Sequence, residues 1–174
     1  FFVSLGLAGT YITFAGLWAV PYLVAVQRMP TTVATYHTSL MMLGFALGSL
    51  ATGHLSDRIG RRRPLILWLG VAYLLTWLPL VACVPLPRPA TLALFAALGA
   101  TSSAFTVTWS SAKELNPPAL SGTAIAVVNA GGFLGTTILQ PLVGWVLDWS
   151  SRGPVPGRAR AAAGIYGPED FRWG

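Results

Sequence analysis

The chain has 174 residues, of which 54% are hydrophobic and only 9% are charged, and its formal net charge is +6. Soluble domains usually carry about 25% charged residues, so this composition excludes an ordinary water-soluble globular protein. The arginines lie in short gaps between long uncharged runs, which excludes a nucleic-acid-binding surface, where basic residues follow one face. A membrane protein that keeps its positive charge on the cytoplasmic side fits best.

Five long uncharged runs predict the fold class. Each run exceeds the roughly 20 residues that a membrane-spanning helix needs. We therefore expect an all-α, polytopic transmembrane helical bundle, with spans over about residues 3–26, 36–52, 64–83, 90–110 and 118–147. Residues 1–148 would form this transmembrane bundle. Residues 149–174 would form an extramembrane loop that leads to a missing helix, so we expect the chain to be a fragment.

The first predicted span carries an aromatic stripe. Tyr11, Phe14, Trp18 and Tyr22 are spaced so that they share one face of a helix. Membrane aromatics often face lipid or lie at the interface, and the alternative is that these rings line a substrate cavity. Both interpretations stay open at this stage.

The second and third spans are separated by GHLSDRIGRRRP, residues 53–64, in which five charged residues occupy the seven positions 57–63. Five positive charges lie in the connections on this side and two, Arg28 and Arg88, on the other, which predicts a cytoplasmic location for this loop. Four arginines of the 149–174 segment would fall on the opposite side and weaken that count. An aspartate at the end of a helix is disfavoured by the helix dipole, so Asp57 should have a cationic partner, either Arg58 or Arg61, or a helix N-terminus outside the chain.

The fourth and fifth spans supply further candidates. Phe105 and Trp109 follow a serine- and threonine-rich stretch, and Asn129 is a polar side chain within the last span. Glycine pairs four residues apart, Gly44 with Gly48 and Gly131 with Gly135, indicate close helix packing.

No Asp, Glu, Lys or Arg lies within any predicted span, which argues against an intramembrane proton relay or hydrolase. The chain shows no nucleotide-binding or hydrolase motif, and its two histidines and one cysteine offer no metal site. We expect neither an enzyme nor a bound cofactor.

The charged loop resembles the signature loop of the major facilitator superfamily, Gly-x-Leu-x-Asp-Arg-x-Gly-Arg-Arg. The residues that match are Gly53, Leu55, Asp57, Arg58, Gly60, Arg61 and Arg62. Residues 109–124, with the glycines that follow, are similar to the passage from the tenth to the eleventh helix of bacterial members. Residues 17–23 are similar to the seventh helix. The resemblance therefore implies helices seven to eleven, with helices one to five as the alternative.

The same resemblance implies a function. It implies a permease of the inner (plasma) membrane that moves a small solute, an organic anion or sugar phosphate, by alternating access, with the loop as a gate latch. The missing N-terminal half and the lipid bilayer would be its partners. The alternatives are a drug efflux permease and a transporter-like receptor. In the family, the seventh and tenth helices line the central cavity, which would place Tyr11, Phe14, Trp18, Tyr22, Phe105 and Trp109 near substrate, with Asn129 as a further candidate.

Overall fold

A computed structural model describes residues 1–150, 166 and 170–172. The described residues form helices and contain no strand, so the predicted all-α fold is confirmed. Five helical segments are long and apolar enough to cross a membrane. Their bounds are Phe2–Ala25, Thr31–Ile59, Arg62–Val81, Arg88–Glu114 and Pro118–Ser150.

The first span is interrupted by a π-helical turn. It consists of α1 (Phe2–Thr13), the π-helical segment η1 (Phe14–Trp18) and α2 (Ala19–Ala25). Pro21 lies three residues after η1, where its ring conflicts with the carbonyl four residues earlier and it has no N–H to donate. A wider turn just before the proline accommodates that loss.

The second span is longer than its apolar run suggests. It is a single helix, α3 (Thr31–Ile59), of 29 residues. At 1.5 Å per residue it measures about 44 Å, against a hydrocarbon core of about 30 Å. Its ends therefore extend beyond the expected 36–52, and residues 53–59 continue the helix instead of forming a loop. The third span, α4 (Arg62–Val81), begins after only two intervening residues.

The fourth span has a break of one residue. Helix α5 (Arg88–Ser102) is followed by α6 (Ala104–Glu114), with Ser103 between them. The Ser103 hydroxyl donates to the carbonyl of Ala100 at 2.6 Å and lies 2.8 Å from the Thr52 hydroxyl of α3. A side chain that hydrogen-bonds within its own turn bends a helix, and here it also joins two spans.

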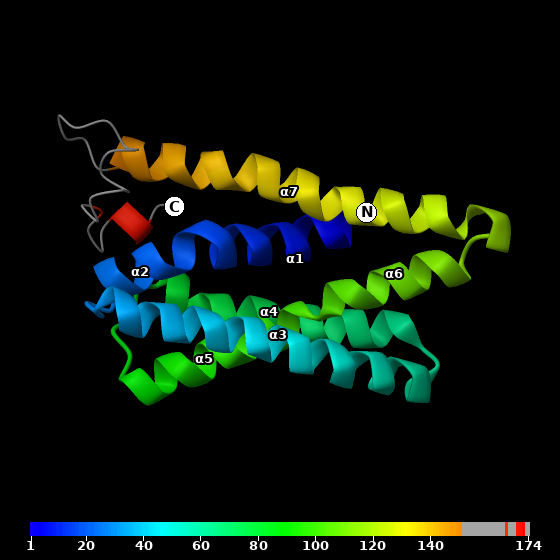
Figure 1. Ribbon diagram of the computed structural model, residues 1–174, viewed down its shortest axis with the longest axis horizontal. Coiled ribbons are helices and arrows are strands. Elements are labelled where there is room, and N and C mark those ends of the chain that lie inside the picture. The colour runs from blue at the N-terminus through cyan, green and yellow to red at the C-terminus, as the bar shows by residue number, and fades with distance from the viewer. Residues whose placement is uncertain (151–165, 167–169, 173–174) are drawn as a thin grey trace.

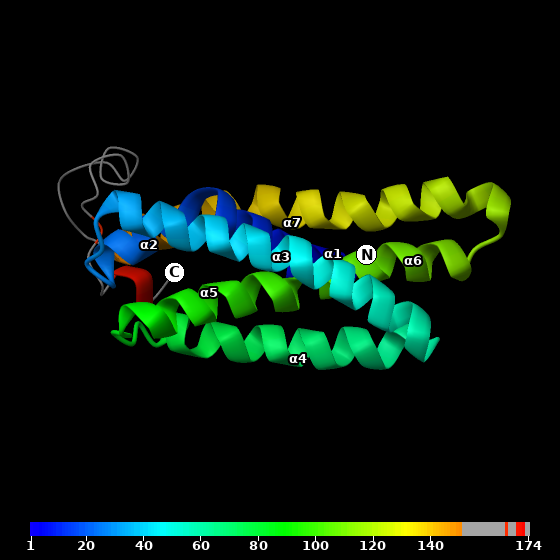
Figure 2. The same cartoon turned by 60° about the horizontal axis from the view of Figure 1, so that its bottom comes forward.

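The fifth span begins with a single 3-10 turn, η2 (Pro118–Leu120), and continues as α7 (Ser121–Ser150). A second short 3-10 turn, η3 (Asp170–Arg172), lies near the chain's end. Figures 1 and 2 show the spans running alongside one another, with α1 beside α7 and α3 beside α5.

Glycines allow the helices of both pairs to approach closely. Between α3 and α5, a Cβ atom added at Gly44 would overlap the backbone carbonyl of Ala96, and one added at Gly99 would overlap that of Met41. Between α1 and α7, a Cβ atom added at Gly135 would overlap the backbone carbonyl of Leu5. The close packing predicted from the glycine pairs is therefore confirmed.

Candidate functional site

The charged motif forms a tight corner between α3 and α4. Only Gly60 and Arg61 separate the two helices. Gly60 has φ +63° and ψ 6°, and its amide donates to the Ser56 carbonyl at 3.1 Å. Glycine adopts this left-handed conformation without the steric cost that other residues incur. Gly60 therefore ends α3 sharply enough for α4 to begin at once.

Arg62 joins three helix ends at this corner. Its Nε donates to Glu114 Oε2 at 2.6 Å, and its Nη2 donates to the other oxygen of the same carboxylate, at the end of α6. Its Nη1 donates to Ser56 Oγ at 2.7 Å, in the last turns of α3. A guanidinium that holds both oxygens of a carboxylate gives the strongest and most directional ion-pair geometry. Arg62, Glu114, Ser56 and Asp57 are called the Arg62 cluster below.

Asp57 is the outer member of the Arg62 cluster. Its Oδ1 lies 3.3 Å from Arg62 Nη2, and its side chain is 74% exposed. The prediction that Arg58 or Arg61 pairs with Asp57 is wrong, because the arginine in contact is Arg62. Arg62 is the first residue of α4, so its side chain reaches back across the corner toward the end of α3 and sideways toward α6.

The remaining motif residues have fewer contacts in this chain. Leu55 is 45% exposed, and Arg58 and Arg61 are exposed. A Cβ atom added at Gly53 would meet no described atom within 4 Å. A close helix contact at Gly53 is therefore not made within the described part of the chain.

The aromatic stripe of the first span lies inside the bundle. Tyr11, Phe14, Trp18 and Tyr22 are each at least 93% buried. The Phe14 ring contacts Trp77 of α4 with centroids 5.0 Å apart, and the Tyr22 hydroxyl donates to the Leu80 carbonyl at 2.9 Å. These rings pack against the chain's own helices, so they form its aromatic core.

The fourth-span candidates extend the same aromatic core. Phe105 stacks on Phe45 of α3 at 5.3 Å, and Phe45 contacts Tyr11 at 5.1 Å. Trp109 contacts Phe105 edge-on at 5.8 Å. Five of the seven cavity candidates are thus buried inside one bundle, and Trp109 is partly buried against them. Asn129 is separate from them, because it lies exposed on α7.

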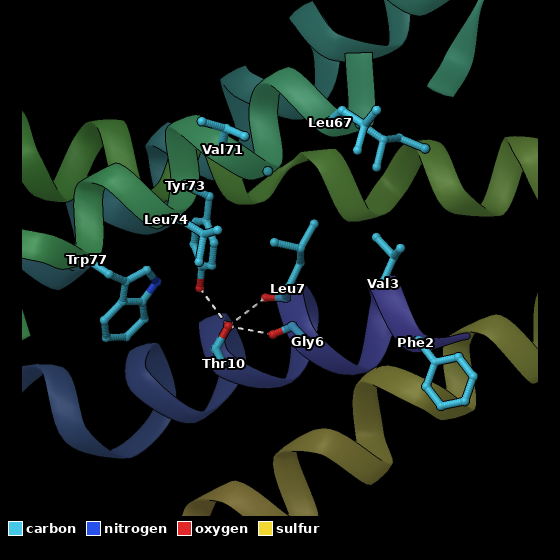
Figure 3. Close-up of a pocket in the computed structure, with 12 residues that line it drawn as sticks. Phe2, Val3, Gly6, Leu7, Thr10, Leu67, Val71, Tyr73, Leu74 and Trp77 are labelled. Atoms are coloured by element: carbon cyan, nitrogen blue, oxygen red, sulfur yellow. Dashed lines mark hydrogen bonds between the residues drawn. The ribbon is translucent and has the colours of Figure 1, made fainter. Parts of the chain in front are cut away.

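A groove and a cavity lie beside the aromatic core. The groove, of about 540 Å³, runs between α1 and α4 from Phe2 to Trp77. Figure 3 shows the Thr10 hydroxyl in it, 2.9 Å from the hydroxyl of Tyr73. The cavity, of about 200 Å³, shares Thr10 and Trp77 with the groove and extends between Trp18, Val143 and Phe171. No charged side chain lines either space in the described part of the chain.

Two buried polar atoms at the cavity have no hydrogen-bond partner among the described residues. They are Thr13 Oγ1 and Trp18 Nε1. A buried polar group without a partner costs about 1–3 kcal/mol. Both atoms lie buried in residues that line the cavity, and each can form a hydrogen bond that the described residues do not supply.

Sequence reasoning missed the partners of the predicted residues. It counted Glu114 only as a loop charge, and it did not select Phe45, Tyr73 or Trp77. The available signal for Glu114 was its position on the same membrane side as the arginines. Nothing in the local pattern of α3 or α4 distinguishes rings that face the core from rings that face lipid.

The residues that the structure describes include no group of three or more His, Cys, Asp or Glu side chains placed to hold a metal ion. Comparison with curated proteins finds no match, and neither does comparison with solved structures. The family model described as Major Facilitator Superfamily matches residues 1–168, nearly the whole chain. Together with five membrane-length helices and the corner motif, this match shows that the chain belongs to the major facilitator superfamily of membrane transporters.

Proposed function

We propose that the chain forms most of one helical half of a transporter, which moves a small solute across the inner membrane by alternating access. Its partner would be a second half of the same transporter, and the two halves would rock about a site between them. The family match and the five membrane-length helices support transport. In this proposal the α3–α4 corner lies in the cytoplasm and acts as a gate latch.

The Arg62 cluster is the observation that carries the gate proposal. One guanidinium holds two carboxylates, so Asp57 shares its cation with Glu114. Asp57 is the carboxylate more exposed to solvent, with a side chain 74% exposed against 56% for Glu114. A cation or a helix N-terminus of the second half would contact Asp57 only when the cytoplasmic side is closed. A contact made in one state alone shifts the equilibrium tenfold for each 1.4 kcal/mol.

The test separates gating from folding. Asp57→Asn should leave the amount of monodisperse protein extracted from membranes almost unchanged, because an exposed ion pair contributes only about 0–1 kcal/mol. It should lower transport per folded molecule severalfold, measured with a solute that the wild type moves. Arg88→Gln, at an exposed charged residue outside the motif, is the matched control. If Asp57→Asn left transport unchanged, Asp57 would be only part of a solvated loop that sets the membrane orientation, and the gate proposal would be refuted.

The lining of the groove and cavity favours one solute class. No described lining residue carries a charge, and the two unpartnered polar atoms can each donate a hydrogen bond. An organic anion or sugar phosphate would need a cation that this chain does not supply there. A lipophilic solute with a hydrogen-bond acceptor fits better, as in a drug efflux permease.

Proteoliposomes can distinguish these solutes. We expect the protein to move chloramphenicol, a neutral lipophilic solute with hydrogen-bond acceptors, in preference to glycerol 3-phosphate, a sugar phosphate. Trp18→Phe should reduce chloramphenicol transport, because it removes the N–H donor and keeps an aromatic ring. Binding of either solute without turnover would favour the receptor alternative. Preferential transport of glycerol 3-phosphate would refute the efflux proposal while leaving transport itself supported.

A further inference from the structure

The α3–α4 corner carries more positive charge than the Arg62 cluster uses. Arg58, Arg61 and Arg63 are exposed, and within the described part of the chain none of them makes an ion pair or a side-chain hydrogen bond. Asp57 and Glu114 already share Arg62. Three guanidinium groups therefore remain available at one end of the bundle.

An apolar surface on α4 begins beside these arginines. Arg63, Pro64, Leu67, Trp68 and Val71 line a shallow hollow of about 490 Å³. Arg63, Leu67 and Val71 are spaced four residues apart and follow one stripe down the helix. Trp68 is 75% exposed and Leu67 is 68% exposed, so no described helix covers this stripe, and Leu67 and Val71 also border the groove between α1 and α4. A positive charge thus lies directly above an uncovered apolar surface with a tryptophan at its edge.

We propose that the α3–α4 corner and the first turns of α4 bind an anionic phospholipid. The headgroup phosphate lies between Arg61 and Arg63, and an acyl chain follows Leu67 and Val71. Trp68 is next to Leu67, about two helical turns from Arg61 and close to the membrane interface, where tryptophan is enriched in membrane proteins. Clustered basic residues next to a membrane helix attract anionic lipids, at about 1 kcal/mol for each residue.

The apolar stripe identifies a lipid as the occupant. A free phosphate or an acidic peptide would use the arginines but would leave Leu67 and Val71 without a partner. A neutral phospholipid would cover the stripe but would bring no net charge to the arginines. Of these molecules, only an anionic phospholipid both pairs with the arginines and covers the apolar stripe. This inference rests on the membrane location of the chain and does not depend on the solute or on gating.

Native mass spectrometry of the detergent-solubilised protein tests the site. Dioleoylphosphatidylglycerol is titrated against the wild type, and dioleoylphosphatidylcholine is the neutral comparison. We expect the wild type to retain the anionic lipid preferentially. Arg61→Gln with Arg63→Gln should weaken its binding about fivefold for each arginine and leave phosphatidylcholine binding unchanged. Trp68→Leu should weaken the binding of both lipids.

Matched variants separate a site from general surface charge. Arg28→Gln with Arg88→Gln removes two exposed arginines from the opposite end of the bundle and should leave the preference unchanged. Trp145→Leu removes another exposed tryptophan, on α7, and should have no effect. Arg61→Lys with Arg63→Lys should restore most of the binding by keeping the charge. Equal losses in the two arginine pairs, or no loss at Arg61 and Arg63, would overturn the proposal.

Discussion

Arg62 occupies the centre of the charged corner because one planar guanidinium can serve several acceptors in fixed directions. It binds Glu114 through two nitrogens and uses a third nitrogen for Ser56. The sequence identified the motif and the need of Asp57 for a cation, but not which arginine supplies it. That choice depends on where α4 begins, since the first helical residue sets the direction of every side chain that follows. Four arginines within six positions look alike until this helix start is known.

Arg62 and Arg63 form a matched pair for a stability measurement. The Arg62 side chain is 18% exposed and holds the ends of α3 and α6, whereas Arg63 is exposed. Arg62→Gln should lower the melting temperature in detergent by roughly 2–6 °C, because it removes charged hydrogen bonds. Arg63→Gln should change it little. Equal melting temperatures for the two variants would show that the Arg62 cluster does not hold the helix ends together.

The five spans were predictable at the scale of helices because an uncharged run of membrane length has few alternatives. Their internal breaks were not. The π-helical turn at Phe14–Trp18 precedes Pro21, and the break at Ser103 accompanies a hydroxyl shared with Thr52. Both depend on how the backbone relaxes around one residue. The glycine pairs predicted close packing, but not that Gly44 faces α5 or that Gly135 faces α1. Such pairing requires the tertiary arrangement.

The α3–α5 contact can be tested with two glycines. Gly99 of α5 lies against the carbonyl of Met41, whereas Gly70 of α4 has no described atom within 4 Å of its Cβ position. Gly99→Ala should destabilise the protein by about 1–3 kcal/mol, because backbone atoms on both sides must move apart. Gly70→Ala should be neutral or stabilising by up to about 1 kcal/mol, since alanine favours a helix. Thermal unfolding in detergent measures both. If Gly70→Ala were destabilised while Gly99→Ala kept the stability of the wild type, the close contact between α3 and α5 at Gly99 would be contradicted.

The charged connections lie at the two ends of the molecule, whereas the aromatic packing lies inside the bundle between them. The α3–α4 corner and the α6–α7 connection lie at one end, and the α2–α3 and α4–α5 connections lie at the other (Figures 1 and 2). The sequence predicted this alternation from the order of its spans. It did not predict that the aromatic stripe of the first span turns inward, because a tyrosine or tryptophan satisfies a lipid interface as well as a core. Burial of Tyr11 and Phe14 is decided by the rings that α3 and α4 bring to them, Phe45 and Trp77.

Cysteine labelling tests which end of the bundle faces the cytoplasm. Ser56 is nearest to the motif's centre, but it is 1% exposed and bonded to Arg62, so burial alone would protect a cysteine there. Ile59, at the end of α3, is 48% exposed, and Thr31 is exposed at the opposite end. In a Cys83→Ala background, Thr31→Cys should react with a membrane-impermeant maleimide in intact cells. Ile59→Cys should react only after permeabilisation, because the connections between spans carry five positive charges at its end of the bundle, against two at the other end, which favours the cytoplasm. Labelling of Ile59→Cys but not of Thr31→Cys in intact cells would reverse the orientation and remove the proposed gate from the cytoplasm.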